Sequence, residues 1–354
     1  MAPAYKNILI VRLSAIGDVA LATAILPGIR RAMPDTRIHW LTEEMGGEVL
    51  GGNKDIDNLI ILPRKRWAKL GKERKYLTAF GEMRQMRRQL RALGADLAID
   101  AQGLLRSAFW TLAAHAKHNI GLCSQEGSQF LMKEVVKKDD NPSGRMCNDY
   151  RCLLEHMGVQ AEPFAMSLCP TEQSREEAAA MLPANDSQQR PVMLYPFTTR
   201  PQKHWFDERW AELARRIASE LKRPVWILGG PANESAAKAI AAASGVGESI
   251  TIVAGKDSNI AQKMGLIERA AAAVGVDTGL SHISLGLGTP TVVMFGSTRI
   301  YTETSPLPGV ILYDRMPCSP CNRHPSCGGD FTCMKKISVG NAFDALVKLL
   351  EGRA

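Results

Sequence analysis

Three short motifs in this 354-residue sequence carry side chains that could move a proton or bind a phosphate group. The first, residues 12–18, reads Arg-Leu-Ser-Ala-Ile-Gly-Asp and ends in the carboxylate of Asp18. A carboxylate within reach of a substrate hydroxyl can act as a general base. An Asp near a helix start is also typical of a helix cap, which would make it structural. The residues alone leave both roles open.

The other two motifs have the composition of a diphosphate site. Residues 198–205 read Thr-Thr-Arg-Pro-Gln-Lys-His-Trp, and their hydroxyl and cationic groups are donors that bind phosphate oxygens. A solvated loop is the alternative there. Residues 277–282 read Asp-Thr-Gly-Leu-Ser-His, where a helix is expected to begin and its free N–H groups could bind a diphosphate. An aspartic protease needs two Asp-Thr-Gly copies, and this chain has one, so that class is excluded.

Several other binding classes are disfavoured by the motifs. The sequence contains neither G-x-x-x-x-G-K-[ST] nor G-x-G-x-x-G, which argues against an ATPase and a simple dehydrogenase. Asp55 and Asp57 could bind a metal diphosphate, but their polar surroundings favour a solvated turn. Near the end of the chain the pattern C-x2-C-x5-C-x5-C is compatible with a structural metal or with a packed, reduced loop. Its members are Cys318, Cys321, Cys327 and Cys333.

The net charge of +8 is concentrated in one segment of the chain. Residues 64–91 hold 11 Lys or Arg and only Glu73 and Glu82 as acids. The positive electrostatic potential of such a cluster attracts nucleic acid, an anionic membrane or a multiply anionic small substrate. The window has few aromatic residues and no nucleic-acid recognition pattern, so the sequence favours a partner other than nucleic acid.

Strands and helices are expected to alternate through the chain, which predicts an α/β fold of two doubly wound parallel sheets. Ligands in such folds bind beyond the carboxyl ends of the strands, where all three motifs fall. The expected strands are 7–13, 37–41, 58–62, 96–100, 192–196, 225–228, 250–253, 272–276 and 291–295. The expected helices are 19–32, 76–93, 104–116, 207–221, 234–243, 260–270 and 341–350.

The length of the chain and its local composition also predict the domain organisation and the cellular compartment. A chain of this length is expected to form two domains, and the polar stretch 163–190 is the expected linker. No stretch fits a signal peptide, and none is apolar over about 18 residues, so we expect a cytoplasmic protein without a membrane span. The eight cysteines are then expected to stay reduced.

The motifs together resemble glycosyltransferase family 9. The resemblance is carried by Ser14-x-x-Gly17-Asp18, by residues 100–104, 198–205 and 277–282, and by Gly-Thr-Pro-Thr at 288–291. It implies a GT-B architecture, with two Rossmann-like domains facing a cleft. The implied acceptor-binding domain is 1–170 and the implied donor-binding domain is 171–335. Residues 336–354 are expected to form a helix that packs back toward the N-terminal domain.

The resemblance also implies an activity and a role for each motif. The implied reaction is inverting transfer of L-glycero-D-manno-heptose from ADP-heptose to the Kdo of lipid A in the lipopolysaccharide inner core, without a metal or another cofactor. Asp18 is the implied general base. The implied donor-binding residues are Thr198, Thr199, Lys203, Glu234, Asp277, Thr278, Gly279, Leu280 and His282.

The basic segment completes these expectations on the acceptor side. The expected acceptor-binding residues are Arg64, Lys65, Arg66, Lys69, Gln102 and Arg106. The expected partners are the ADP-sugar, Kdo–lipid A and the anionic cytoplasmic face of the inner membrane, bound peripherally by a monomer. The cysteine pattern is similar to that of heptosyltransferases that add later core sugars, so first and later heptose addition both stay open. A nucleotide-sugar epimerase and a non-enzymatic anion binder are the remaining alternatives.

Overall fold

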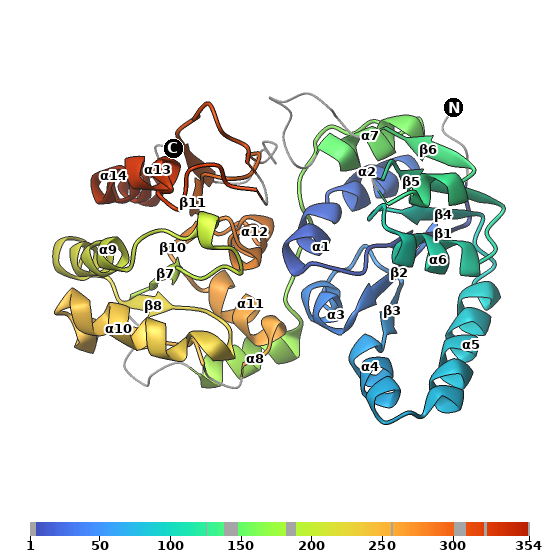
Figure 1. The fold of residues 1–354 in the computed structure, drawn as a ribbon, viewed down its shortest axis with the longest axis horizontal. Helices are drawn as coiled ribbons and strands as arrows, with labels where there is room; N and C mark the ends of the chain where they lie inside the picture. Colours follow the sequence, from blue (N-terminus) through green and yellow to red (C-terminus); the bar gives the residue numbers. More distant parts are fainter. Residues whose placement is uncertain are drawn as a thin grey trace. The chain divides into compact units, whose positions relative to one another are not determined.

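The computed structural model describes residues 5–124, 126–137, 148–181, 189–255, 258–300, 309–321 and 324–352. Internal contacts divide the chain into two compact units. Unit 1 comprises residues 1–141 and 147–169, and unit 2 comprises residues 142–146 and 170–354. The main division at 169/170 lies next to the expected boundary at 170/171. Each unit is built around its own sheet (Figure 1).

Unit 1 contains a parallel six-stranded sheet in the order β3-β2-β1-β4-β5-β6. The central strand β1 is almost wholly apolar and fully buried from its second residue, as expected for a strand covered on both faces. The strands are β1 (Asn7–Val11), β2 (Arg37–Glu43), β3 (Asn58–Leu62), β4 (Leu97–Asp100), β5 (His118–Leu122) and β6 (Glu134–Val136).

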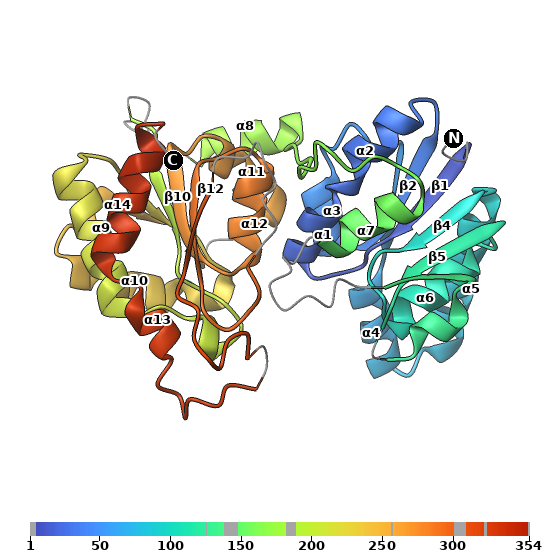
Figure 2. The same ribbon diagram turned by 90° about the horizontal axis from the view of Figure 1, so that it is seen from above.

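Helices cover both faces of the unit 1 sheet (Figure 2). The expected helix 19–32 is divided into α1 and α2. On the face with α5 and α6, Met86, Leu90 and Trp110 join strand residues in one apolar core. The helices are α1 (Ile16–Ala22), α2 (Ile25–Ala32), α3 (Glu44–Leu50), α4 (Arg64–Lys72), α5 (Tyr76–Ala92), α6 (Leu105–Ala113) and α7 (Asn148–His156), with the 3-10 turn η1 (Ser128–Leu131).

Unit 2 repeats the same topology, with a parallel sheet in the order β12-β11-β10-β7-β8-β9. In both sheets the strand order reverses beside the first strand of the unit, which is the arrangement of a Rossmann fold. The strands are β7 (Val192–Tyr195), β8 (Val225–Ile227), β9 (Ile250–Ile252), β10 (Ala272–Val276), β11 (Thr291–Phe295) and β12 (Gly309–Tyr313).

The helices of unit 2 lie on both faces of its sheet, with α9 and α14 on one face and α11 and α12 on the other (Figure 2). The helices are α8 (Glu172–Ala180), α9 (Asp207–Glu220), α10 (Glu234–Ser244), α11 (Ile260–Glu268), α12 (Gly279–Gly286), α13 (Thr332–Lys336) and α14 (Val339–Leu350). The 3-10 turns are η2 (Pro201–Lys203), η3 (Pro231–Asn233) and η4 (Gly247–Ser249).

The last helix, α14, belongs to the core of unit 2. Its apolar residues, including Ala342, Phe343 and Leu346, are buried with residues of α9, β10 and β11. The Trp205 indole donates a hydrogen bond of 2.9 Å to the Ile337 carbonyl just before α14. These contacts show that unit 2 itself buries the apolar face of α14, and the expectation that the helix packs toward the N-terminal domain stays a prediction. No described helix is long and apolar enough to cross a membrane.

Candidate active site

In unit 1 the first motif lies where the strand order of the sheet reverses. β1 is hydrogen-bonded to β2 on one side and to β4 on the other, and the chain leaves both β1 and β4 at the same edge. Residues 12–18 follow β1, and residues 101–106 follow β4. Crevices at such points are the ordinary ligand sites of doubly wound folds.

Asp18 lies in the first turn of α1, but it is not the helix cap. The cap position is Ala15, whose side chain makes no capping hydrogen bond. The Asp18 Oδ2 atom instead pairs with Nη2 of the buried Arg12 at 2.8 Å, and the Asp18 side chain is 40% exposed. The cap interpretation is therefore wrong. The geometry leaves an accessible carboxylate oriented by a buried cation.

Gln102 positions this loop. Its Oε1 atom accepts hydrogen bonds from the backbone N–H groups of Leu13 at 2.8 Å and of Ser14 at 3.4 Å. The Asp100 carboxylate accepts the N–H groups of Gln102 and Gly103 at 3.0 Å each, and burial raises the pKa of Asp100. The contacts of Gln102 are those of a residue that joins two loops, and its acceptor-binding role stays a prediction.

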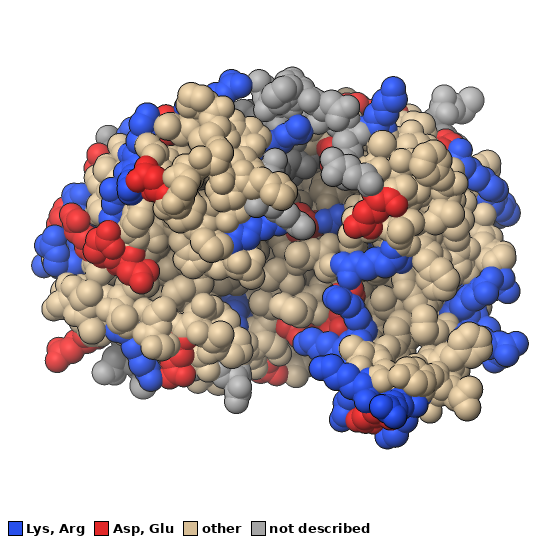
Figure 3. Space-filling view, viewed as in Figure 1, with Lys and Arg blue, Asp and Glu red and all other residues tan. Residues whose placement is uncertain are grey.

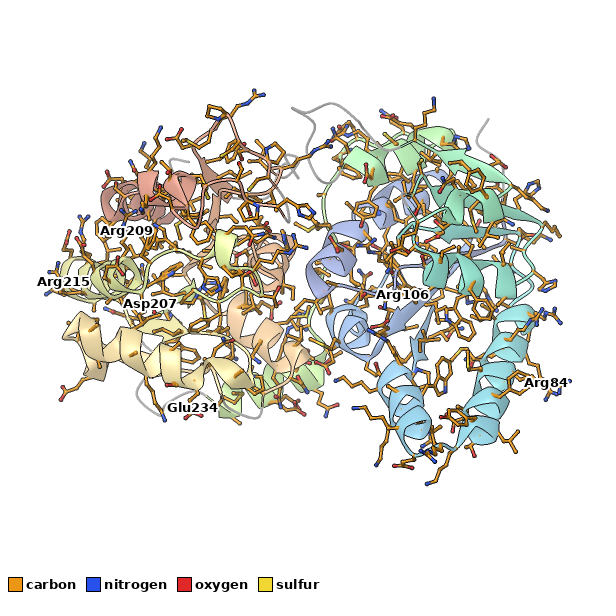
Figure 4. The ribbon with its side chains drawn as sticks, viewed as in Figure 1. Arg84, Arg106, Asp207, Arg209, Arg215 and Glu234 are labelled. Carbon is orange, nitrogen blue, oxygen red and sulfur yellow. The ribbon has the colours of Figure 1, made fainter. Side chains whose placement is uncertain are left out.

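Arg106 joins the first motif to Glu43, a residue that the motifs did not predict. Its guanidinium donates to the Ser14 hydroxyl and binds Oε1 of Glu43 at 3.0 Å. Glu43, at the end of β2, also pairs with Arg64 at 3.2 Å. Arg106 lies at the start of α6 (Figure 4), and its acceptor-binding role stays a prediction. Glu43 could have been found from its place at the carboxyl end of a predicted strand.

The remaining basic candidates lie on α4 and differ in their contacts. Arg66 forms a bidentate pair with Glu82 of α5 at 2.6–2.9 Å, which joins the two helices. Lys69 is 78% exposed and lies 3.9 Å from Glu73. Lys65 is exposed as well. The structure therefore brings Arg64 and Arg106 together at Glu43, whereas Arg66 is used to join α4 to α5.

In unit 2 the two other motifs meet at the matching point of the sheet. β7 and β10 are hydrogen-bonded neighbours, and residues 198–205 follow β7 while residues 277–282 follow β10. Lys203 pairs with Oδ2 of Asp277, the Asp277 side chain being only 4% exposed. The His282 ring lies 3.4 Å from Oδ1 of the same carboxylate. Thr298 donates to Oδ2 at 2.5 Å from the loop after β11.

The charge of Asp277 is set by these neighbours. Burial alone would raise its pKa, but the hydrogen bond from His282 and the Lys203 ammonium outweigh burial and hold the pKa well below the usual range. The Asp277 carboxylate is therefore ionised at neutral pH. Thr298 was missed because residues 297–298 lie outside the 277–282 motif, although a polar pair directly after a strand was a usable signal.

Backbone geometry adds donors beside this buried pair. Thr278 occupies the cap position of α12, and the first turn of that helix includes Gly279 and Leu280. N–H groups in a first turn lack intrahelical acceptors, so those of Gly279 and Leu280 suit a diphosphate. The His204 ring binds the Thr198 carbonyl at 2.8 Å, which holds the 198–203 loop. Thr198 and Thr199 both lie in this loop and are not buried.

Glu234 begins α10 and follows β8, the neighbour of β7. Its carboxylate pairs with Lys238 at 2.6 Å and is 49% exposed. Gly255 lies against it, since a Cβ there would meet the Glu234 side chain at 2.3 Å. Figure 4 labels Glu234 on α10. This position, after a strand next to β7, suits a donor-binding residue, and that role of Glu234 stays a prediction.

The two metal-site candidates of the sequence, the Asp55 and Asp57 pair and the four-cysteine pattern, can be compared with their surroundings in the structure. Asp57 binds Arg30 at 2.6 Å and accepts the Ile38 N–H at 2.8 Å, which agrees with the turn interpretation. The four cysteines of the C-x2-C-x5-C-x5-C pattern line one cavity of about 50 Å³. Across the described ranges, no group of three or more His, Cys, Asp or Glu is arranged to hold a metal ion.

Two Rossmann-like units, each with polar groups where its strand order reverses, define a GT-B fold. The chain is similar in structure to E. coli ADP-heptose LPS heptosyltransferase II, with a TM-score of 0.76 and 20% identity over 98% of this chain and 99% of that one. It is also similar to E. coli heptosyltransferase WaaC with ADP-2-deoxy-2-fluoro heptose, with a TM-score of 0.71 and 21% identity over 98% of this chain and 100% of that one.

The sequence has named relatives as well. Lipopolysaccharide heptosyltransferase 1 of Pseudomonas aeruginosa is 27% identical over 317 residues, which cover 89% of this chain and 86% of that protein. The model of glycosyltransferase family 9 (heptosyltransferase) matches residues 83–326. The chain belongs to this family and is a glycosyltransferase.

Proposed function

We propose that this glycosyltransferase transfers L-glycero-D-manno-heptose from ADP-heptose to a Kdo residue of lipid A, with inversion at the anomeric carbon. The observation that carries the proposal is the pair of polar sites at the two strand-order reversals, one with an accessible carboxylate and one with buried charge and helix N–H groups. The names of the relatives, with 27% identity along most of the chain, support heptose and lipopolysaccharide as the sugar and the pathway.

The proposed reaction uses Asp18 as the base. Its Oδ2 atom is held by Arg12, so Oδ1 takes the proton from the acceptor hydroxyl as that oxygen attacks the anomeric carbon. The bond from that carbon to the ADP oxygen breaks on the opposite face, and ADP leaves with the electron pair. Lys203 and the N–H groups at the start of α12 stabilise the growing charge on the diphosphate, so the proposed chemistry needs no metal.

The proposal includes a subcellular location. A lipid-linked acceptor lies in a membrane, so we propose peripheral binding at the cytoplasmic face of the inner membrane by a monomer. The acceptor groups, phosphates and carboxylates, match the cations at Arg64, Lys65, Lys69 and Arg106.

The test is a panel of nucleotide sugars offered with Kdo–lipid A, with the products identified by mass spectrometry. We expect heptose transfer from ADP-heptose alone. Transfer only to an acceptor that already carries heptose would assign the chain to a later core step. Conversion of the donor without any acceptor would mean that the enzyme is an epimerase.

The same assay tests the base. Asp18→Asn keeps the size of the side chain but removes the basic oxygen, so turnover should fall at least about 100-fold while the dissociation constant for ADP-heptose changes less than about twofold. Asp35→Asn, at an exposed turn of the same unit, is the matched control and should keep full turnover. Unchanged turnover in Asp18→Asn would remove this residue from the mechanism.

A further inference from the structure

Exposed apolar side chains are distributed unevenly over this chain. Among the described residues, every strongly exposed large apolar side chain lies in unit 1, and unit 2 has none. A soluble surface that keeps such groups exposed together commonly marks an interaction site. Three of them, Tyr76, Leu77 and Phe80, come from one turn at the start of α5 and are 64%, 89% and 65% exposed.

These three side chains lie in the first turns of α5, before the part of the helix that packs on the core. Positions three and four apart share a helix face, so Tyr76 and Leu77 lie beside Phe80. The later turns of the same helix pack on the core through Met86 and Leu90, which are buried. The exposed apolar group therefore has no part in the packing of unit 1. We call residues 72–80 the hairpin tip, because they join α4 to α5.

Cations surround this apolar group. Lys72, Arg74 and Lys75 are exposed in the turn before α5, and Glu73 is the only acid among residues 72–80. Glu73 pairs with Lys75 at 2.7 Å. Figure 3 shows Lys and Arg gathered over the α4–α5 hairpin, and Figure 4 shows Arg84 on the outer side of α5. The hairpin tip thus combines two groups. We call Tyr76, Leu77 and Phe80 its apex, and the surrounding cations Lys72, Arg74 and Lys75 its collar.

The hairpin is braced so that the tip is presented as a folded element. Glu82 of α5 binds Arg66 and the Trp67 indole of α4, the latter at 3.0 Å. Trp67 in turn stacks on Trp110 of α6, with ring centroids 5.6 Å apart. These contacts join the hairpin to the sheet-covering helix α6, so the exposed side chains belong to an ordered surface.

We propose that the hairpin tip docks on an anionic lipid bilayer, with Leu77 and Phe80 inserted at the headgroup boundary and the collar on lipid phosphates. An anionic membrane fits both parts of the hairpin tip, because its negatively charged headgroups lie over an apolar acyl layer. Duplex nucleic acid would satisfy the cations only, because Leu77 at the apex can neither stack nor form a hydrogen bond. The inference deepens the proposed function, since it names the surface on which a lipid-linked acceptor would be met.

Vesicle sedimentation with the full chain tests this inference without any sugar transfer. Vesicles of phosphatidylcholine alone are compared with vesicles that contain phosphatidylglycerol as well. We expect the wild type to bind the anionic vesicles and to bind the neutral ones at least about tenfold more weakly. The double variant Leu77→Gln with Phe80→Gln leaves the net charge unchanged and removes two apolar side chains. Its partitioning to anionic vesicles should fall at least about tenfold at any salt concentration, because burial of apolar surface does not depend on charge screening. Lys72→Gln with Arg74→Gln should also weaken binding, mainly at low salt.

Phe130→Gln is the matched control, since Phe130 is 85% exposed on η1 outside the hairpin. It should bind vesicles like the wild type, and an equal loss there would place the docking surface elsewhere. Absence of wild-type binding to anionic vesicles, or preferential binding to duplex DNA that survives Leu77→Gln with Phe80→Gln, would overturn the inference. Heptose transfer to a water-soluble Kdo acceptor should be unchanged in the tip variants, which separates failure of this inference from failure of the proposed function.

Discussion

The buried charges of unit 2 show how a single residue can serve both binding and stability. Taking the Asp277 carboxylate out of water costs free energy that Lys203, His282 and Thr298 offset. An incoming diphosphate would compete with Asp277 for the same ammonium. Lys203 is therefore already oriented before the donor binds, and its loss affects two properties that can be measured separately.

Lys203→Met should weaken ADP-sugar binding and also destabilise the fold at neutral pH. Removing one partner of a buried pair costs about 3 kcal/mol or more in the free energy of unfolding, because the other charge stays buried. Calorimetry with ADP-heptose and urea unfolding at pH 7 measure the two effects. An unaltered dissociation constant would contradict the diphosphate role, whatever happens to stability. Lys238→Met, which breaks only the exposed pair with Glu234, should cost less than about 1 kcal/mol.

The stability loss in Lys203→Met should depend on pH in a defined direction. In the wild type the pKa of Asp277 lies below its unfolded value, so its contribution is fully present above about pH 4 and is lost as pH falls through the folded pKa. Without Lys203 the folded pKa rises. The difference between wild type and variant should therefore be largest above about pH 5 and shrink as pH falls below about 4. A difference that stays constant from pH 7 to pH 3 would mean that the Asp277 charge is not involved.

At the scale of elements, the site depends on loops that join neighbouring strands. Gln102, after β4, accepts the Leu13 N–H after β1, so it fixes the loop that ends in Asp18. Gln102→Leu leaves that buried N–H without an acceptor, which costs about 1–3 kcal/mol. If Gln102 acts by positioning, turnover should fall while the KM for the acceptor stays constant. Gln102→Glu keeps the acceptor oxygen and should recover most of the turnover. A rise in acceptor KM with unchanged turnover would instead support direct acceptor binding.

Local patterns predicted the elements that hold these loops. Buried apolar runs such as those of β1 and β10 are unambiguous in sequence, and all three chemical motifs lie at their carboxyl ends. β5, β6 and β12 were not predicted. Most residues of β6 and β12 are not buried, so they lack that continuous apolar pattern, and β5 begins with the polar pair His118 and Asn119. The partners of a site residue were harder to predict. Glu43 and Thr298 lie at the carboxyl ends of predicted strands, but the site that each one joins depends on the order of strands in the sheets, which local periodicity does not contain.

At the scale of the whole molecule, unit 1 carries most of the positive charge and all of the strongly exposed large apolar groups among the described residues. At the matching point of its sheet, unit 2 has the buried pair of Lys203 and Asp277. This division supports the proposal that the first unit binds an anionic, lipid-linked acceptor and the second unit binds a nucleotide sugar. Arg66 is paired with Glu82 of α5, so it is better left in place when the acceptor surface is tested.

Removing the remaining cations of α4 should therefore affect one substrate and not the other. In the triple variant Arg64→Gln, Lys65→Gln and Lys69→Gln, the KM for Kdo–lipid A should rise at least about tenfold at low salt, since each cation near the anionic groups contributes about 1 kcal/mol. The KM for ADP-heptose should stay within about twofold, and the salt dependence of the acceptor KM should become shallower. The matched control replaces three exposed cations of unit 2 with Gln, at Arg215, Lys222 and Arg269. Equal rises in both KM values, or an equal effect in the control, would show that these cations act through net charge and not by contacting the acceptor.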